Sequence, residues 1–128
     1  MNPNESFWII PESETKFELP RALIRQQAAA LANITNGLLD GGFSQQSLPN
    51  GTIVDILSMR VPRLGYSMTI LRVTSTLLQP YPVIVEDLIN DEVHQKVSQE
   101  GYSGVIRHIL SSEKMQKIII ALKAQAEA

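Results

Sequence analysis

The sequence predicts an α+β domain: an antiparallel meander of three to four strands covered by an N-terminal helix and C-terminal helices. Apolar residues recur at helical spacing near both ends of the chain, whereas the middle holds segments rich in β-branched residues, separated by short turns. Strands that follow one another through short turns pair as antiparallel neighbours. Because the strands are grouped apart from the helices, the class is α+β rather than alternating α/β.

The first helix is predicted at residues 21–35. Pro20 stands at its first turn, where the missing N–H of proline costs nothing. The apolar positions that define its buried face follow at helical spacing and are Ile24, Ala28, Leu31, Ile34 or Thr35, and Leu38. Gly37 ends the helix, because glycine adopts the left-handed conformation freely.

The middle of the chain holds the segments predicted as strands, which are residues 37–47, 52–61, 66–78 and 83–85. In the first segment we expect a bend at Gly41 and Gly42, because glycines inside strands usually mark bulges. The last segment is short and is flanked by Pro80 and Pro82. Because proline cannot donate a hydrogen bond to a neighbouring strand, this segment is expected at an edge of the sheet.

After the last strand the pattern changes to a helical period. We expect a short helix over residues 90–98, capped by Asn90 or Asp91 and ended by Gly101. A longer helix with a serine cap is predicted over residues 113–126. Its predicted buried stripe consists of Met115, Ile118, Ile119, Leu122 and Ala126.

The composition is that of one globular domain, residues 1–128, with an N-terminal arm over residues 1–18. Hydrophobic residues make up 44% of the chain and charged residues 19%, below the roughly 25% usual for charged residues. Either apolar surface therefore remains for an oligomer interface or a partner site, or the surface is rich in neutral polar residues. The arm carries an apolar island, residues 7–10, around the only tryptophan, Trp8. We expect this island to pack onto the domain or onto a neighbouring subunit.

Charge and cysteine content exclude several classes of protein. The formal net charge is −2, so no global basic field attracts nucleic acid or anionic membranes. The chain holds no cysteine, which excludes disulfides, thiol nucleophiles and cysteine-ligated zinc. A secretory signal and an apolar run of about 18 residues are both absent, so we expect a cytoplasmic protein without a membrane partner.

The sequence holds no recognisable catalytic motif. Gly-Tyr-Ser-Gly at residues 101–104 lacks the second glycine of a nucleophile elbow, because Val105 stands in its place. Neither His94 nor His108 has a second ligand at metal spacing. The acids between residues 86 and 92 lack the EF-hand pattern and are expected to form a solvated cap region. We therefore expect no catalytic residues, no metal and no cofactor, and hence a protein that is not an enzyme.

The strongest candidates for a binding site are three arginines in a stretch of the chain that contains no acid. Arg72 lies in the middle of the third predicted strand, on the same expected face as Tyr66. Arginine and tyrosine are enriched at the centres of protein–protein interfaces. The predicted partner-binding residues are Arg60, Arg63, Arg72, Tyr66, Tyr81 and Trp8.

These observations favour a non-enzymatic protein-binding module, such as a bacterial or phage-type immunity protein, antitoxin or accessory subunit. The expected partner is another protein, and a homodimer is one form of such a complex. Two alternatives stay open. An RNA- or nucleotide-binding module would use the arginine-lined sheet face with the tyrosines as a stacking platform. An enzyme with a dispersed site would use His108 and the acidic cluster.

Overall fold

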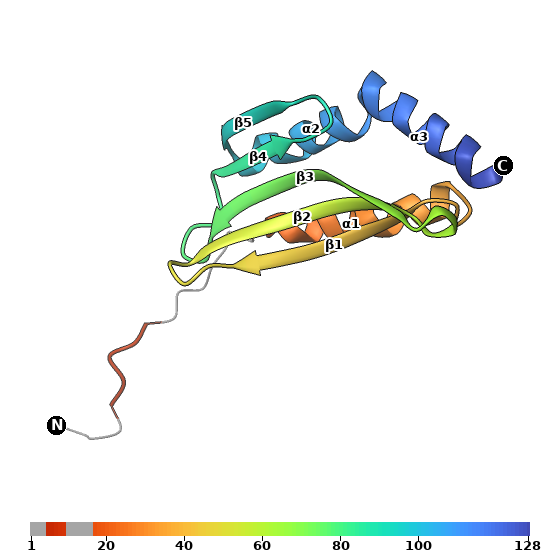
Figure 1. Cartoon of the computed structure of the whole chain (residues 1–128). Helices are drawn as coiled ribbons and strands as arrows, with labels where there is room; N and C mark the ends of the chain where they lie inside the picture. The colour runs from red at the N-terminus through yellow and green to blue at the C-terminus, as the bar shows by residue number, and fades with distance from the viewer. Residues whose placement is uncertain (1–4, 10–16) are drawn as a thin grey trace.

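The computed structural model describes residues 5–9 and 17–128, and its elements follow one another as drawn in Figure 1. The α-helices of the described residues are α1 (Pro20–Ile34), α2 (Gln99–Leu110) and α3 (Glu113–Glu127). The strands are β1 (Asp40–Ser47), β2 (Thr52–Val61), β3 (Tyr66–Thr76), β4 (Val83–Asp87) and β5 (Glu92–Val97). A short 3-10 helix, η1 (Pro62–Leu64), connects β2 to β3.

The strands of the described chain form one 5-stranded antiparallel sheet in the order β1-β2-β3-β4-β5. The predicted α+β class is therefore confirmed. The strands predicted over residues 52–61 and 66–78 are adjacent and antiparallel, as the meander requires. The expected number of three to four strands was too low, because β5 was not recognised in the sequence.

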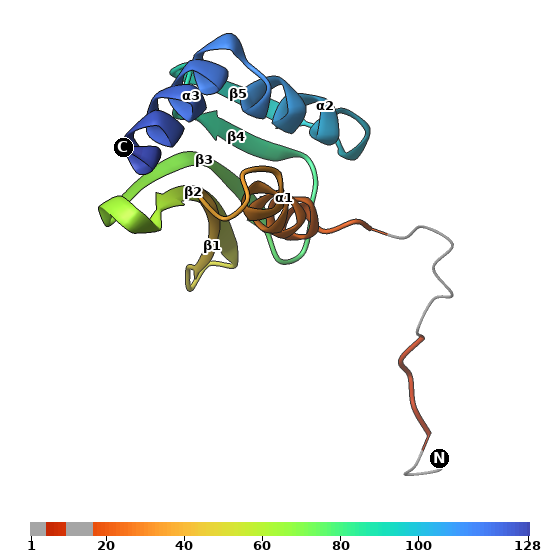
Figure 2. The same ribbon diagram turned by 90° about the vertical axis from the view of Figure 1, so that its right-hand side faces the viewer.

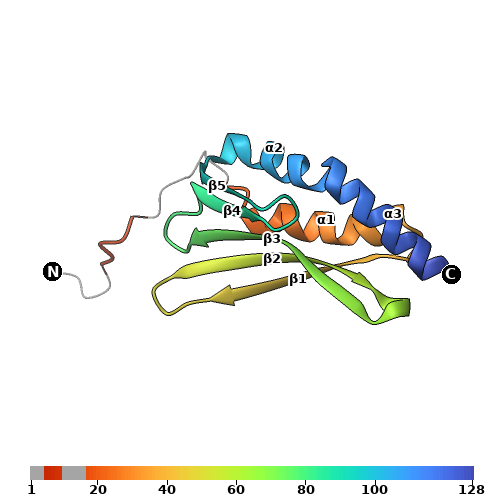
Figure 3. The same ribbon diagram turned by 45° about the horizontal axis from the view of Figure 1, so that its top comes forward.

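The helices lie together on one face of the sheet (Figure 2, Figure 3). α1 packs over β1 and β2, whereas α2 lies near β5. An apolar core fills the space between the helices and the sheet, and it draws residues from both layers. Its fully buried members include Ile24, Leu39, Met59, Leu71, Val85, Ile106, Ile109 and Met115.

The first helix agrees with its prediction at both ends. Pro20 occupies the first turn, and Gly37 after the last turn has a positive φ of 81°. Thr35 stands directly after the helix and is 4% exposed. Its hydroxyl donates to the carbonyl of Leu31 (2.8 Å) and accepts from the amide of Leu39 (3.1 Å). One buried side chain thus satisfies backbone groups on both sides of the helix end and directs the chain into β1.

The helix predicted over residues 90–98 is wrong, because this segment forms a turn followed by β5. Asn90 and Asp91, expected as a helix cap, lie in the turn between β4 and β5, where Asp91 has a φ of 55°. Asparagine and aspartate favour helix caps and tight turns alike, so the local pattern does not separate the two. Ser98 caps α2 by accepting from the amide of Gly101, which therefore lies in the first turn of a helix rather than at its end.

The addition of β5 also corrects the predicted position of β4. This strand is not at an edge, since it pairs with β3 on one side and with β5 on the other. Pro80 and Pro82 both precede the strand, so neither removes a hydrogen-bond donor from the sheet. The edges of the sheet are β1 and β5.

The glycine pair of β1 does not mark a bulge, contrary to the prediction, because the pairing of β1 with β2 is continuous along β1. Gly41 instead permits a close approach of α1. A Cβ atom at this position would lie 2.2 Å from the carbonyl oxygen of Ala28. At Gly42 the nearest atom would lie 3.6 Å away, which is an ordinary contact. The helix can therefore rest directly on the strand at Gly41 only because no side chain is present there.

One bulge of this sheet lies in β3, where the register with β2 shifts between Leu57 and Ser58. Leu71 pairs with Leu57 and Thr69 pairs with Ser58, which leaves Ile70 as the extra residue. Ile70 and Leu71 are consecutive and are only 3% and 0% exposed. A regular strand turns consecutive side chains to opposite faces, so the bulge changes the face that each half of β3 presents.

The last helix is confirmed over the predicted residues. Its cap is Ser112, whose hydroxyl accepts from the amide of Met115 at 3.2 Å. Met115 and Ala126 are buried at the two ends of the predicted stripe. The middle of the stripe packs against the core but is only half-buried, at Ile118, Ile119 and Leu122. Along the described residues, none of the helices has the length and apolar character needed to cross a membrane.

Candidate functional site

Two of the predicted arginines lie on the sheet face opposite the helices, and each is close to an acid. Arg60 Nη2 donates to Asp40 Oδ2 at 2.8 Å and to the carbonyl of Gly41 at 3.0 Å. Arg72 Nη1 lies 3.4 Å from Glu86 Oε2 on the neighbouring strand β4. Both pairs are partly exposed to water, so each contributes at most about 1 kcal/mol to stability. The pairing leaves little unbalanced positive charge on this face.

The other predicted residues of the sheet do not join Arg72. Arg63 is exposed in η1, at the end of the sheet. Tyr66 lies beyond the bulge, at a position of β3 that pairs with a buried residue of β2, and so belongs to the helix-covered face. Tyr81 also packs on the helix side, with its ring centroid 5.8 Å from that of Tyr102. These tyrosines therefore form no stacking platform beside the arginine.

The N-terminal arm places its aromatic residues in water. Phe7, Trp8 and Ile9 are 78%, 88% and 87% exposed. Ile10, the last residue of the predicted apolar island, lies outside the described residues. Three large apolar side chains in a row on a surface are unusual for a protein that has no partner for them.

A groove lies between α1 on one side and α2 and α3 on the other, on the helical face of the sheet, and we call it the interhelical groove. Because α1 packs over β1 and β2 while α2 lies near β5, the backbones of the two helical groups approach each other at few points. The groove consists of two adjoining hollows, both open to solvent, which share Gln27, Ile34 and Leu110 in their walls. Its walls carry Leu23, Leu31 and Ile34 from α1 and Arg107, Leu110 and Ile119 from α2 and α3.

The interhelical groove is mainly apolar. Its floor is formed by the buried side chains of Leu57, Met59 and Ile70. Ile34 stands at its rim with 73% of its surface exposed. Arg107 is the charged residue among those that line it, and no acid lines it within the described chain. A concave apolar surface with a basic rim suits an apolar protein segment flanked by acids.

One end of the groove is held by a pair of tyrosines. Tyr102 of α2 donates a hydrogen bond to the carbonyl of Pro20 at 2.9 Å, which ties α2 to the start of α1. Tyr81 donates from its hydroxyl to the carbonyl of Glu18 and packs edge-on against Tyr102. Burial raises the pKa of Tyr102, as do the nearby Tyr81 and Asp55, so its hydroxyl stays protonated and remains a donor. The spacing of α1 and α2 is thus fixed here by polar contacts.

A buried carboxylate, Asp55, is the strongest candidate for acid–base chemistry. It is 2% exposed, at the edge of a hollow that Arg21 and Ser75 also line. Burial raises the pKa of Asp55, and the hydrogen bond from Gln45 Nε2 to Oδ1 (2.7 Å) and the charges of Arg21 and Arg25 oppose this rise. Its hydrogen-bond partner is an amide on the adjacent strand, so the pair reads as a cross-strand structural contact.

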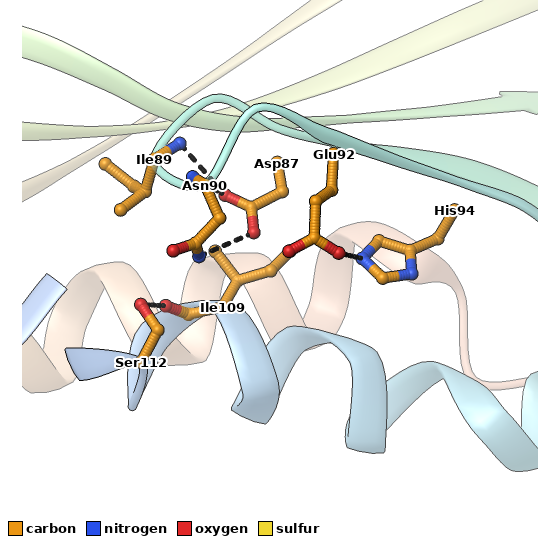
Figure 4. Close-up of polar contacts among 7 residues, drawn as sticks. All are labelled: Asp87, Ile89, Asn90, Glu92, His94, Ile109 and Ser112. Carbon is orange, nitrogen blue, oxygen red and sulfur yellow. Dashed lines mark hydrogen bonds and ion pairs between the residues drawn. The ribbon is translucent and has the colours of Figure 1, made fainter. Parts of the chain in front are cut away.

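Asp87 ends β4 and Glu92 begins β5, and the side chain of Asp87 holds the turn between the two strands (Figure 4). Asp87 Oδ1 accepts from the amides of Ile89 and Asn90, each at 2.9 Å, and Oδ2 accepts from Asn90 Nδ2 at 2.8 Å. Glu92 Oε2 lies 3.9 Å from His94 Nε2. In the part of the chain that is described, no group of three or more His, Cys, Asp or Glu residues is arranged to hold a metal ion.

His108 does not join this acidic cluster. Its side chain is exposed on α2, with its ring centroid 6.1 Å from that of His94 and the two rings edge to face. Among the residues described, no hydrogen bond connects His108 to an acid of the β4–β5 turn. The alternative of a dispersed enzyme site, which would use His108 with these acids, stays a prediction.

No protein-family model matches the chain, and comparison with curated proteins and with solved structures finds no match either. The candidate site consequently rests on its geometry. Sequence reasoning missed the interhelical groove because its walls are far apart in the chain. One signal was present: α1 carries apolar residues such as Leu23, Leu31 and Ile34 in addition to the buried Ile24 and Ala28, which is a wider stripe than its contact with the sheet uses.

Proposed function

We propose that this protein is a non-enzymatic protein-binding module, and that its interhelical groove takes an apolar segment of another protein molecule. The observation that carries this proposal is the apolar floor and rim of a groove that α1 lines from Leu23 to Ile34. This part of the helix is about 16 Å long, enough for an extended segment of about five residues at roughly 3.3 Å each. Exposed Ile34 at the rim is the anchor that a partner is expected to cover.

The groove supports protein binding better than the arginine-lined sheet face does. Arg60 and Arg72 already have acidic partners within the fold, whereas Ile34 and its neighbours expose apolar surface to water. Burial of apolar surface is the main driving force of protein association. The immunity, antitoxin and accessory-subunit roles expected from the sequence are particular forms of this function, and the identity of the bound protein separates them.

Site-specific photocrosslinking in producing cells tests the proposal. A photoreactive phenylalanine analogue at Ile34 is expected to form a covalent adduct with another protein molecule. The same analogue at Ile120, which is 69% exposed on α3 but lines none of the hollows described, is the matched control and is expected to form none. Adding Arg107→Glu is expected to reduce the yield of the adduct. Equal yields at Ile34 and Ile120, or no adduct at Ile34, would overturn the proposal.

A further inference from the structure

The chain itself contains a segment of the kind that the interhelical groove fits. Phe7, Trp8 and Ile9 are consecutive, apolar and almost fully exposed. The segment that contains them, residues 5–9, is drawn in red away from the helices in all views (Figures 1, 2 and 3). The molecule therefore has two uncovered apolar surfaces, one a short extended segment and the other a groove. Each is the chemical complement of the other.

The charges carried by the two surfaces are opposite in sign. The arm carries Glu5, Glu12, Glu14 and Glu18 against a single basic side chain, Lys16. The groove carries Arg107 on its wall and no acid among its described lining residues. Opposite charges at the border of an apolar contact increase the rate of association and fix the direction in which the segment lies.

The arm is long enough for its apolar segment to reach the interhelical groove. The ten residue steps from Ile9 to Leu19 span at most about 35 Å, which exceeds the ~22 Å length of α1. The apolar segment can therefore reach any point along the groove, whose α1 wall runs from Leu23 to Ile34. The same reach allows the segment to enter the groove of a second molecule placed beside the first.

From these observations we infer that the occupant of the interhelical groove is the segment Phe7–Ile9 of a second copy of this chain. This inference rests on the proposed function and names the partner. In a two-fold symmetric dimer each copy inserts its arm into the groove of the other, so both apolar surfaces are covered in both molecules. The four aromatic side chains of the two arms bury roughly 600–1,000 Å². The two grooves lose a similar area to the contact, so the total surface buried is about the 1,600 Å² of a standard interface.

A complementation experiment on the full chain tests this arrangement. The arm variant carries Phe7→Asp and Trp8→Asp, and the groove variant carries Ile34→Glu and Arg107→Glu. All four positions are exposed, so the variants are expected to fold. Trp8 is the only tryptophan, so in a mixture of the two variants all tryptophan emission comes from the arm of the groove variant. Self-association is measured by sedimentation equilibrium, and burial of Trp8 by the wavelength of its emission.

The wild-type chain is expected to form dimers with blue-shifted Trp8 emission. Each variant alone is expected to associate at least about tenfold more weakly, the loss that removal of one anchor side chain brings. Mixing the two variants restores one intact arm and one intact groove, so it is expected to shift Trp8 emission to the blue and to produce a mixed dimer. Ile120→Glu, the control, is expected to behave as wild type.

Three results would overturn the inference. They are a wild-type monomer with exposed Trp8, a strict monomer in which Trp8 is already buried in its own groove, and a mixture that shows no recovery. These results leave the proposed function separately testable. Crosslinking from Ile34 to a different protein supports that function while the second copy is excluded as the occupant, and absence of any adduct removes both.

Discussion

At the scale of single residues, Asp55 is where burial and charge are in conflict. Its carboxylate lies on the helix-covered face of β2 at a position that the alternation of the strand assigns to the core, among neighbours such as Ile53 and Leu57. One hydrogen bond from Gln45 and two nearby arginines compensate the loss of water around it only in part, and the pKa of Asp55 remains raised.

The raised pKa predicts that Asp55→Asn stabilises the protein at neutral pH. The pKa of the carboxyl in the native state lies above its ordinary value of 3.8, so the native state holds its proton more firmly than the unfolded state. The free energy of unfolding of the wild type therefore falls as pH rises from 3.8 through the raised pKa. Asparagine carries no charge and still accepts from Gln45. Urea unfolding is expected to show a gain for Asp55→Asn at pH 7 that shrinks near about pH 4.

The control for this prediction is Asp40→Asn, which removes an exposed carboxylate that pairs with Arg60 at the surface. It is expected to change stability by less than about 1 kcal/mol and to give no gain at neutral pH. If Asp55→Asn destabilises the protein at pH 7, the carboxylate contributes more through its contacts than its burial costs.

At the scale of elements, the contact between α1 and β1 depends on the absence of one side chain. Gly41→Ala is expected to lower the free energy of unfolding by about 1–3 kcal/mol, because the added methyl group meets the backbone of α1 at Ala28 and the helix has to move. Gly42→Ala is the matched control. Its methyl group meets the side chains of Arg60 and Ser58 at 3.6 Å, which are ordinary contacts, so little change is expected. Urea unfolding measures both variants, and equal losses would show that strand geometry rather than helix contact selects glycine.

The elements that sequence reasoning predicted are those whose signals are local. The proline and glycine at the two ends of α1, and the β-branched run of β3, report on their own backbone, and both elements lie where expected. β5 was missed because its sequence, Glu92–Val97, is mostly polar and its turn residues also serve as helix caps. The bulge at Ile70 has no local signal, since it arises from the register between two strands. The interhelical groove likewise exists only once α1 and α2 have docked on different strands.

At the scale of the whole molecule, the sheet has two unlike faces. The helices, the core and the interhelical groove lie on one face. The other face carries Arg60 and Arg72 with their acidic partners, between neutral side chains of β2 and β3 such as Val54 and Thr74. The arginine face was predicted from sequence to bind a partner, and that stays a prediction. Because no residue belongs to both faces, mutations can test the arginine face without changing the groove.

The variant in which alanine replaces Arg60, Arg63 and Arg72 tests the arginine face alone. The ion pairs of Arg60 and Arg72 are partly exposed, so each is expected to contribute less than about 1 kcal/mol, and the free energy of unfolding should change little. Dimer formation and the emission of Trp8 are expected to stay as in wild type, because the arm and the groove are unchanged. Urea unfolding and sedimentation equilibrium measure the two properties on the same preparation. A loss of several kcal/mol would show that the arginines hold the sheet together, whereas dissociation of a stable, folded variant would place the contact between copies on the arginine face instead of the groove.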